Sequence, residues 1–454
     1  MDAGGTIRHA FLDAGNDELI AFMECNDVPG IPNDFDTGLN RGLGIQGGVV
    51  HFAFRVDDEE ELSSKREELV AKGVTVTDVV DHGWCQSIYF RDPNQLQLEF
   101  CCLSREFGDD LLADRTSAGW QAHIHHAYFL GLQLMIATRK GPQVMEKWMF
   151  NLFRRQHLDK FLSSFDKLGL SDLPNAVACA KYHVLSNNIG GVGVEYMAES
   201  DRKAWVRFRY PRWMYAGPAI CGVPVEVSRG FLNGWYAYNG VSLGNPRLGF
   251  VCVSEDMTGE YGLCGYFYEY DHDLAPHERL QFAKDEQPPA YLPEDQPEPP
   301  GDQWNTLRLE KANRNYAMEY VRNGLCELRL VMGDNETLKL GSLAARLIGL
   351  QYFQETLSMI GAQDGDLKAA GHYLSRMLTG MGDDVQLVKS DLQTDRFEVR
   401  QKDLRIVRGL QGEERSMVLA CWIELWRGTL ASQQQQKSAD VQINEDSLIW
   451  SINS

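Results

Sequence analysis

Residues 87–100, SIYFRDPNQLQLEF, limit the fold most tightly, because two alternating segments flank a turn motif. Pro93 sets the φ angle of a tight turn, and the side chains of Asp92 and Asn94 can hydrogen-bond back to the backbone, so the motif predicts a β-hairpin. Glu99 ends the second strand between two apolar residues. A buried carboxylate is costly without a partner, so we expect a cation beside Glu99.

The segment upstream predicts that this hairpin completes a β-α-β-β-β unit. VVHFAFRV alternates and is rich in β-branched and aromatic residues, which favours a strand. The acidic start of the following segment suits a helix N-terminus, and a glycine ends it. The predicted elements are a strand at 49–56, a helix at 58–72, a strand at 74–81 and two strands within 85–101.

His51 opens the first strand of this unit and Glu99 closes the last, and the two are 99 − 51 = 48 positions apart. In a curled sheet, the first and last strands can bring both side chains to one concave face. An imidazole and a carboxylate with open positions beside them suit a divalent metal ion. A core histidine and a solvent-facing carboxylate are the structural alternative, and the combined motif favours the metal ligands.

Residues 1–105 resemble the vicinal oxygen chelate superfamily, which includes glyoxalase I, extradiol dioxygenases and fosfomycin- and bleomycin-resistance proteins. The resemblance rests on HFAFRV, the helix after it, GWCQSIYFRDPN and LQLEF. The chain departs from the family at Gln95, where a glycine usually follows the DPN turn. Glycine accommodates a positive φ there, so Gln95 implies strain or a different turn.

The resemblance implies an α+β fold in which two βαβββ modules form a half-barrel around a divalent metal, here Fe, Mn, Ni or Zn. Glyoxalase-type members draw a ligand from the first and last strand of each module. By this resemblance Glu24 ends the first module, His51 and Glu99 are the ligands of the second, and His9 is a candidate acid/base. Extradiol-type members use two histidines and one glutamate, with no ligand at the position of Glu24.

The first module is expected to be incomplete, because only a hairpin within residues 6–24 precedes the second module. Truncation of a longer natural chain is the favoured explanation, and such a chain would not hold the metal properly. The alternative is that another element, or the partner in a homodimer, completes the site.

The expected function is that of a metal-dependent dioxygenase, lyase or isomerase acting on a small oxygen-rich molecule. One alternative is a non-catalytic module that binds a small ligand, as resistance-type members of the family do. The other alternative places a hydrolase-like activity in the C-terminal part of the chain.

The C-terminal part is predicted to be a duplicated α+β domain, because helical and strand-like segments recur at an offset of about 190 residues. The copies are expected at 116–284 and 303–454, joined by an acidic, proline-rich linker at 285–302. The duplicated domain resembles aminothiazoline-carboxylate hydrolase-like proteins in its helix, its paired strands and its final tryptophan-containing strand. No catalytic motif of that group is present in this sequence, so the resemblance assigns no catalytic role to any residue of this chain.

The composition argues against nucleic acid and a membrane as partners of this chain. A net charge of −20 with no basic face argues against nucleic acid, and no stretch has the roughly 20 apolar residues of a membrane span. Ten scattered cysteines without CxxC spacing predict reduced thiols and a cytoplasmic protein.

Three other segments contain residues that could bind a metal ion or a substrate. In HIHHAYF (123–129), alternation would put two histidines on one face, but no acidic residue or cysteine stands at ligand spacing, so a cluster at a helix start is favoured. In YEYDHDLAPHERL, the run from Asp271 to His277 could bind a metal, although a polar loop is the more common case. His82 and Trp84 could contact substrate from a loop, or simply pack there.

Overall fold

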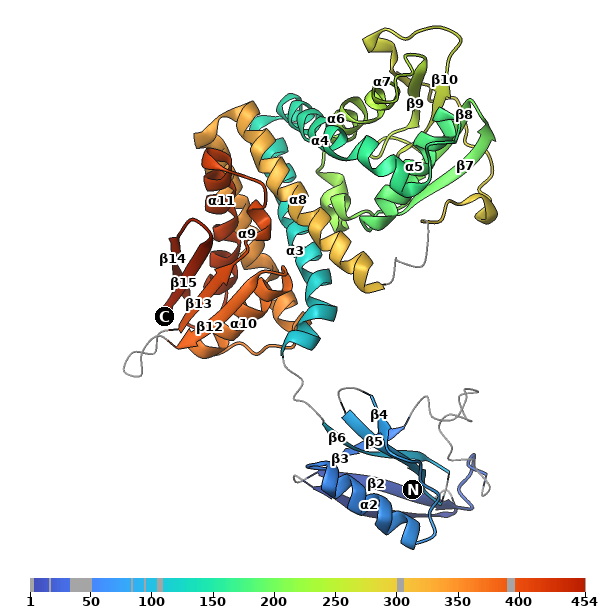
Figure 1. The fold of residues 1–454 in the computed structure, drawn as a ribbon, viewed down its shortest axis with the longest axis vertical. Coiled ribbons are helices and arrows are strands. Elements are labelled where there is room, and N and C mark those ends of the chain that lie inside the picture. Colours follow the sequence, from blue (N-terminus) through green and yellow to red (C-terminus); the bar gives the residue numbers. More distant parts are fainter. Residues whose placement is uncertain are drawn as a thin grey trace. The chain divides into compact units, whose positions relative to one another are not determined.

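The structure is a computed structural model that describes residues 4–15, 18–32, 51–82, 85–93, 95–103, 109–299, 306–389 and 397–453. The chain forms two compact units, Met1–Gly108 and Asp109–Ser454, and each is described by itself (Figure 1). In the described parts of the chain, no helix is long and apolar enough to cross a membrane. All ten cysteines are free.

The N-terminal unit contains the expected β-α-β-β-β order. A two-stranded antiparallel sheet, β1–β2, precedes a four-stranded sheet in the order β3–β6–β5–β4, in which β3 runs parallel to β6. The predicted α+β class is therefore confirmed. The elements are β1 (Thr6–Gly15), β2 (Glu18–Asn26), β3 (Phe52–Arg55), α2 (Glu59–Ala71), β4 (Val80–Asp81), β5 (Cys85–Arg91) and β6 (Gln97–Leu103).

Helix α2 begins where the sequence predicts, because the Asp58 side chain accepts a hydrogen bond from the Glu61 N–H at 2.8 Å. Leu62 on this helix packs with Ile88 and Cys102 of the sheet in a small apolar core. Since side chains alternate along a strand, the neighbours of these residues point to the opposite face. That opposite face carries the polar groups of the candidate site.

The turn between β5 and β6 contains a strained residue, as the sequence suggested. Gln95 has φ of 69°, a conformation that costs a residue other than glycine about 1 kcal/mol. The turn is stabilised by Asp92, whose carbonyl accepts from the Gln95 N–H at 2.9 Å and whose carboxylate accepts from the Leu96 N–H at 2.7 Å. Asn94, the other predicted turn residue, lies outside the described residues, as does Trp84.

The C-terminal unit repeats one order of elements: three helices, two strands, a helix and two strands, to which the first run adds a short helix and a third closing strand. The first run contains α3 (Asp109–Lys140), α4 (Pro142–Phe165), α5 (Asn175–Ile189), β7 (Val194–Ser200), β8 (Lys203–Phe208), α6 (Glu226–Gly234), α7 (Asn239–Ser242), β9 (Leu248–Ser254), β10 (Cys264–Glu269) and β11 (Leu280–Phe282). The second contains α8 (Thr306–Met332), α9 (Asp334–Met359), α10 (Leu367–Gly380), β12 (Asp384–Lys389), β13 (Phe397–Lys402), α11 (Gly412–Ala431), β14 (Ser438–Ile443) and β15 (Ser447–Asn453).

The two sheets have the same topology, β9–β10–β8–β7 and β14–β15–β13–β12, and β11 extends the first beside β9. Gly141 and Gly333 precede α4 and α9 with φ of 85° and 81°, which sets the offset between these helices at 333 − 141 = 192 residues. We call the run from α3 to β11 the first copy and the run from α8 to β15 the second copy. The copy bounds expected from the sequence, 116–284 and 303–454, stay predictions.

The first helix of each copy packs more extensively on the other copy than on its own. In α3, the Tyr128 hydroxyl donates to the carbonyl of Gly341 on α9 at 3.0 Å. In the opposite direction, Trp148 Nε1 of α4 donates to the carbonyl of Gly324 on α8 at 2.7 Å. Helices α3 and α8 lie side by side between the two sheets (Figure 1), and one continuous apolar core includes residues of both copies.

Most of the predicted linker, residues 285–299, is described, and part of it lies along an edge strand. The Gln296 side chain accepts from the Tyr196 N–H of β7 at 2.9 Å and donates to its carbonyl at 2.8 Å. These two bonds satisfy the edge of the sheet as a neighbouring strand would. Residues 300–302 lie outside the described residues.

Helix packing in the second copy depends on a glycine. We expect Gly349→Ala to lower the free energy of unfolding by about 1–3 kcal/mol, because its Cβ would lie 2.0 Å from the Leu425 carbonyl oxygen of α11. Gly119→Ala on α3 is the matched control, since nothing lies within 4 Å of its added Cβ and alanine favours a helix by about 0.5–1 kcal/mol. Urea denaturation measures both changes, and equal effects would contradict the prediction.

Candidate functional site

The four-stranded sheet brings His51 and Glu99 into contact. Strand β3 pairs with β6 so that Ala53 lies opposite Glu99, and His51 stands two residues before Ala53 on the same face. The Nε2 atom of His51 is 2.6 Å from Oε2 of Glu99. The Glu99 side chain is only 8% exposed and that of His51 is 27% exposed, so the carboxylate has the cationic or hydrogen-bonding partner that its burial requires.

Two further polar side chains adjoin this pair. Tyr89 lies opposite Glu99 on β5, and its ring meets the ring of His51 edge-on at a centroid distance of 5.6 Å. The Tyr89 hydroxyl is 2.9 Å from Nε2 of His82. Burial and the nearby charge of Glu99 raise the pKa of Tyr89, so its hydroxyl keeps its proton at neutral pH. The sequence interpretation missed Tyr89, although the register of the hairpin places it across from Glu99.

The chemistry of the pair fits a divalent metal ion. A borderline divalent ion binds imidazole nitrogen and carboxylate oxygen, and both are present on one face. Cys101 lies two residues beyond Glu99 on β6, but burial and the charge of Glu99 raise the pKa of its thiol, so it is a poor source of thiolate. No group of three or more metal-binding side chains occurs within the described ranges, and His51 and Glu99 form a contacting pair.

Glu24 and His9 lie on the hairpin formed by β1 and β2. Arg8 is opposite Glu24 in the register, and its Nε donates to the Glu24 carboxylate at 2.9 Å. This contact lowers the pKa of Glu24, whose side chain is 52% exposed. His9 is exposed and lies opposite Met23. A role for Glu24 as a ligand would therefore require it to leave Arg8, and the roles of both residues stay predictions.

The sequence places His51 at the start of the first strand of the β-α-β-β-β unit and Glu99 at the end of the last, but His51 immediately precedes β3 and Glu99 is the third residue of β6, which continues to Leu103. A histidine and a glutamate in contact across this unit are the arrangement that the resemblance to the vicinal oxygen chelate class implies. Residues 1–100 match the family model described as the Glyoxalase/Bleomycin resistance protein/Dioxygenase superfamily, which confirms the resemblance seen in the sequence. The match covers 100 of 454 residues. Neither the search of curated proteins nor that of solved structures found a match.

The histidines of HIHHAYF lie within α3, so their assignment to a helix start is wrong. Nε1 of Trp422 donates to Nε2 of His125 at 3.1 Å, which leaves Nδ1 to donate to the Gln121 carbonyl at 2.8 Å. Burial lowers the pKa of His125 to about 4. His123 instead pairs with Glu355 at 3.0 Å. The two histidines therefore have separate structural partners.

The run from Asp271 to His277 follows β10. Asp271 pairs with Arg202 at 2.7 Å, and the ring of His272 lies near that of Tyr270. No metal-binding group of three side chains is found in this loop, all of which is described. The contacts fit the polar-loop interpretation.

The sequence interpretation missed a buried ionic cluster in the first copy. Nη1 of Arg212 donates to Oδ1 of Asp256 at 2.6 Å, and both side chains are almost fully buried. The same carboxylate accepts from the hydroxyls of Tyr210, Tyr215 and Ser228. Asp256 lies in the loop after β9, where SEDMTGE has no pattern that distinguishes a buried acid from an exposed one.

The second copy has no counterpart of this charge pair at the matching position. Arg212 immediately precedes the 3₁₀ turn Trp213–Tyr215 that follows β8. The residue that precedes the corresponding turn, Arg405–Val407 after β13, is the buried Leu404. Since a leucine occupies this position in the same topology, the fold itself does not require the ion pair.

We expect Asp256→Asn to lower the free energy of unfolding by about 3–5 kcal/mol, because it leaves the Arg212 guanidinium buried without a counter-charge. The control is Asp271→Asn, which removes an exposed ion pair with Arg202 and should have a much smaller effect, because water screens the pair. Chemical denaturation monitored by tryptophan fluorescence measures both. A small effect at Asp256 would show that the cluster contributes little to stability.

His126 should make the C-terminal unit sensitive to acid. Its ring stacks on Trp213 at a centroid distance of 4.0 Å, its Nε2 has no hydrogen-bond partner among the described residues, and burial lowers its pKa to about 3. A histidine has a pKa near 6.5 in an unfolded chain, so between these values the unfolded state binds more protons. Stability contributed by neutral His126 is therefore complete above pH 6.5 and is lost as the pH falls.

We expect His126→Phe, which keeps an aromatic ring on Trp213, to reduce the loss of stability between pH 7 and pH 5 by about 2 kcal/mol. The matched control is His277→Phe at a solvent-exposed loop position, which should leave the pH dependence unchanged. Urea denaturation at a series of pH values measures the slope. Equal slopes for the wild type and His126→Phe would contradict the prediction.

Proposed function

We propose that the N-terminal unit is a metal-dependent enzyme, a dioxygenase, lyase or isomerase, that acts on a small oxygen-rich molecule. The observation that carries the proposal is the contact between His51 and the buried carboxylate of Glu99 in a domain that matches this superfamily. His51 and Glu99 would hold a divalent Fe, Mn, Ni or Zn ion. Such an ion would act as a Lewis acid toward a substrate that binds it through two oxygens.

The residues around the pair support substrate binding next to the metal ligands. Tyr89 keeps its proton, so its hydroxyl is a donor for a substrate oxygen, and its contact with His82 orients it. The Tyr89 ring also limits the orientation of the His51 imidazole. The sheet holds the carboxylate of Glu99 in a mostly buried position, which favours one preformed arrangement of ligands.

Glu24 and His9 have distinct proposed roles. Glu24 would be a further ligand in a glyoxalase-type set, after it exchanges Arg8 for the metal, and would have no such role in an extradiol-type set. His9 would be an acid/base on the same hairpin. A second protomer in a homodimer could complete the half-barrel, and the cysteine content supports a cytoplasmic location.

We expect the full chain, refolded or dialysed with one metal at a time, to retain about one equivalent of at least one of these ions, because the His–Glu pair is a preformed part of a site. His51→Ala and Glu99→Gln should each lose the ion, because removal of either donor breaks the pair. Elemental analysis gives the stoichiometry, and the shift of the unfolding temperature on metal addition gives a second readout.

Two carboxylate controls make this test specific. Glu68→Gln, on the exposed face of α2, should leave metal content unchanged. Glu24→Gln should lower metal content only if the ligand set is of the glyoxalase type. Absence of metal from the wild type under every condition would contradict the proposal, and small-ligand binding without metal would then favour the resistance-type alternative.

A further inference from the structure

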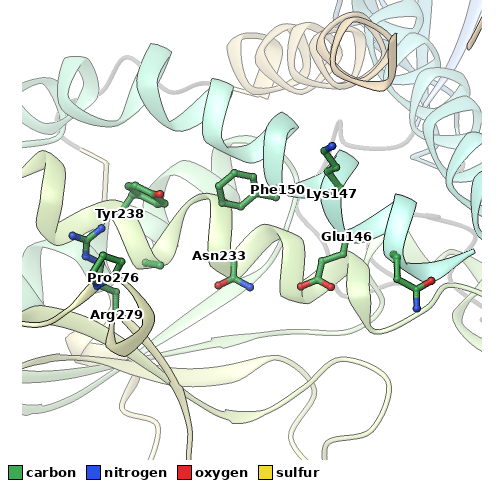
Figure 2. Close-up of a pocket in the computed structure, with 9 residues that line it drawn as sticks. Glu146, Lys147, Phe150, Asn233, Tyr238, Pro276 and Arg279 are labelled. Carbon is green, nitrogen blue, oxygen red and sulfur yellow. The ribbon is translucent and has the colours of Figure 1, made fainter. Parts of the chain in front are cut away.

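A pocket of 380 Å³ lies in the first copy, along the seam between α4 and α6. Its volume is within the range of small-molecule sites. Figure 2 shows Glu146, Lys147 and Phe150 entering from α4, Asn233 from α6, and Tyr238 and Arg279 at one end.

The helices beside the pocket are held close together. A Cβ at Gly234 of α6 would lie 2.5 Å from the Phe150 carbonyl oxygen, so only glycine allows this approach. Because the seam is packed this tightly, the pocket is a preformed feature of the two helices. A preformed site loses little entropy when it binds a ligand.

The basic side chains around the pocket differ from many others of this acidic chain, because they lack carboxylate partners in the described parts of it. The guanidinium groups of Arg154 and Arg279 lie 4.0 Å and 5.8 Å from the ring centroid of Tyr238. Among the residues that the structure describes, neither arginine has an ion-pair partner, and Lys147 has none either. One Arg154 nitrogen is buried without a hydrogen bond. The sequence has 64 acidic residues against 44 basic ones, so carboxylate partners are not scarce.

The second copy has cations at the corresponding positions, and both are paired with glutamates. With the offset of 192, Lys147 corresponds to Lys339 (147 + 192) and Arg154 to Arg346 (154 + 192). Lys339 lies 3.8 Å from Glu336, and Arg346 lies 3.2 Å from Glu424. The packing of these helices therefore allows both cations to be paired, and the first copy leaves them available.

We propose that the pocket binds a small aromatic monoanion. The anionic group would pair with Arg279, and the planar ring would lie against Tyr238 and Phe150, whose side chains line the same pocket. Arg154, 4.0 Å from the centroid of the Tyr238 ring, adds positive potential near the pocket. Glu146 lines the pocket as well and disfavours a second negative charge, so the site selects a monoanion over a dianion. This site is separate from the proposed metal site and does not rest on it.

Titration calorimetry on the full chain with benzoate tests the proposal. We expect saturable binding, which Arg279→Gln weakens about tenfold because it removes one charge-assisted contact. Lys339→Gln and Arg346→Gln in the second copy are matched controls and should leave benzoate affinity unchanged. Glu146→Gln should tighten benzoate binding by about twofold to fivefold, a gain that misfolding cannot produce.

Ligand controls separate charge from shape. Benzamide has the ring without the charge, and inorganic phosphate has the charge without the ring, so each should bind at least about tenfold more weakly than benzoate. Three results would overturn the proposal: no benzoate binding to the wild type, equal affinity in Arg279→Gln, or phosphate binding as tight as that of benzoate.

Discussion

The C-terminal unit depends on an exchange of helices between its two copies: α3 of the first copy packs mainly on the second, and α8 of the second copy packs mainly on the first. Each helix buries its apolar side chains mainly against the other copy, and the bonds from Tyr128 to Gly341 and from Trp148 to Gly324 fix that arrangement in both directions. One core then serves both sheets. A buried core of this size can tolerate local departures from symmetry, such as the Arg212–Asp256 pair, because the shared helices hold the framework in place.

Duplication also provides an internal reference for function. Where both copies place the same residue type, as at Lys147 and Lys339, the difference lies in the partners that surround it. The first copy combines a pocket, unpaired cations and aromatic side chains, whereas its counterpart pairs the corresponding cations with glutamates. Comparison within one chain thus separates what the fold requires from what a site adds.

In the N-terminal unit, one face of the four-stranded sheet forms the apolar core and the other carries the polar residues of the candidate site. One face packs against α2 through Leu62, Ile88 and Cys102, and the other carries Glu99, Tyr89 and His51. Strand alternation alone produces this division, which is why the hairpin could be interpreted correctly from a short motif. The strain at Gln95 was also foreseen, since a missing glycine at a turn that needs positive φ leaves a recognisable sign.

Other features could not be predicted because they depend on contacts between distant segments. Asp256 looks like any acidic residue in a loop, and its burial follows from tyrosine, arginine and serine side chains that two other segments supply, residues 210–215 and helix α6. Glu24 suited a ligand by analogy, but only the register of β1 and β2 revealed Arg8 beside it. The histidines of HIHHAYF likewise could not be assigned without knowing that Trp422, from the other copy, bonds to His125.

By itself, the sequence determined the β-α-β-β-β unit, the pairing of His51 with Glu99 and the repeated α+β pattern, because local periodicity and turn chemistry act over a few residues. Only the tertiary structure decided which helices are exchanged, which cations remain unpaired and where the pocket between α4 and α6 lies. These properties arise from packing and charge between segments that lie far apart in the sequence, and a linear pattern does not record them.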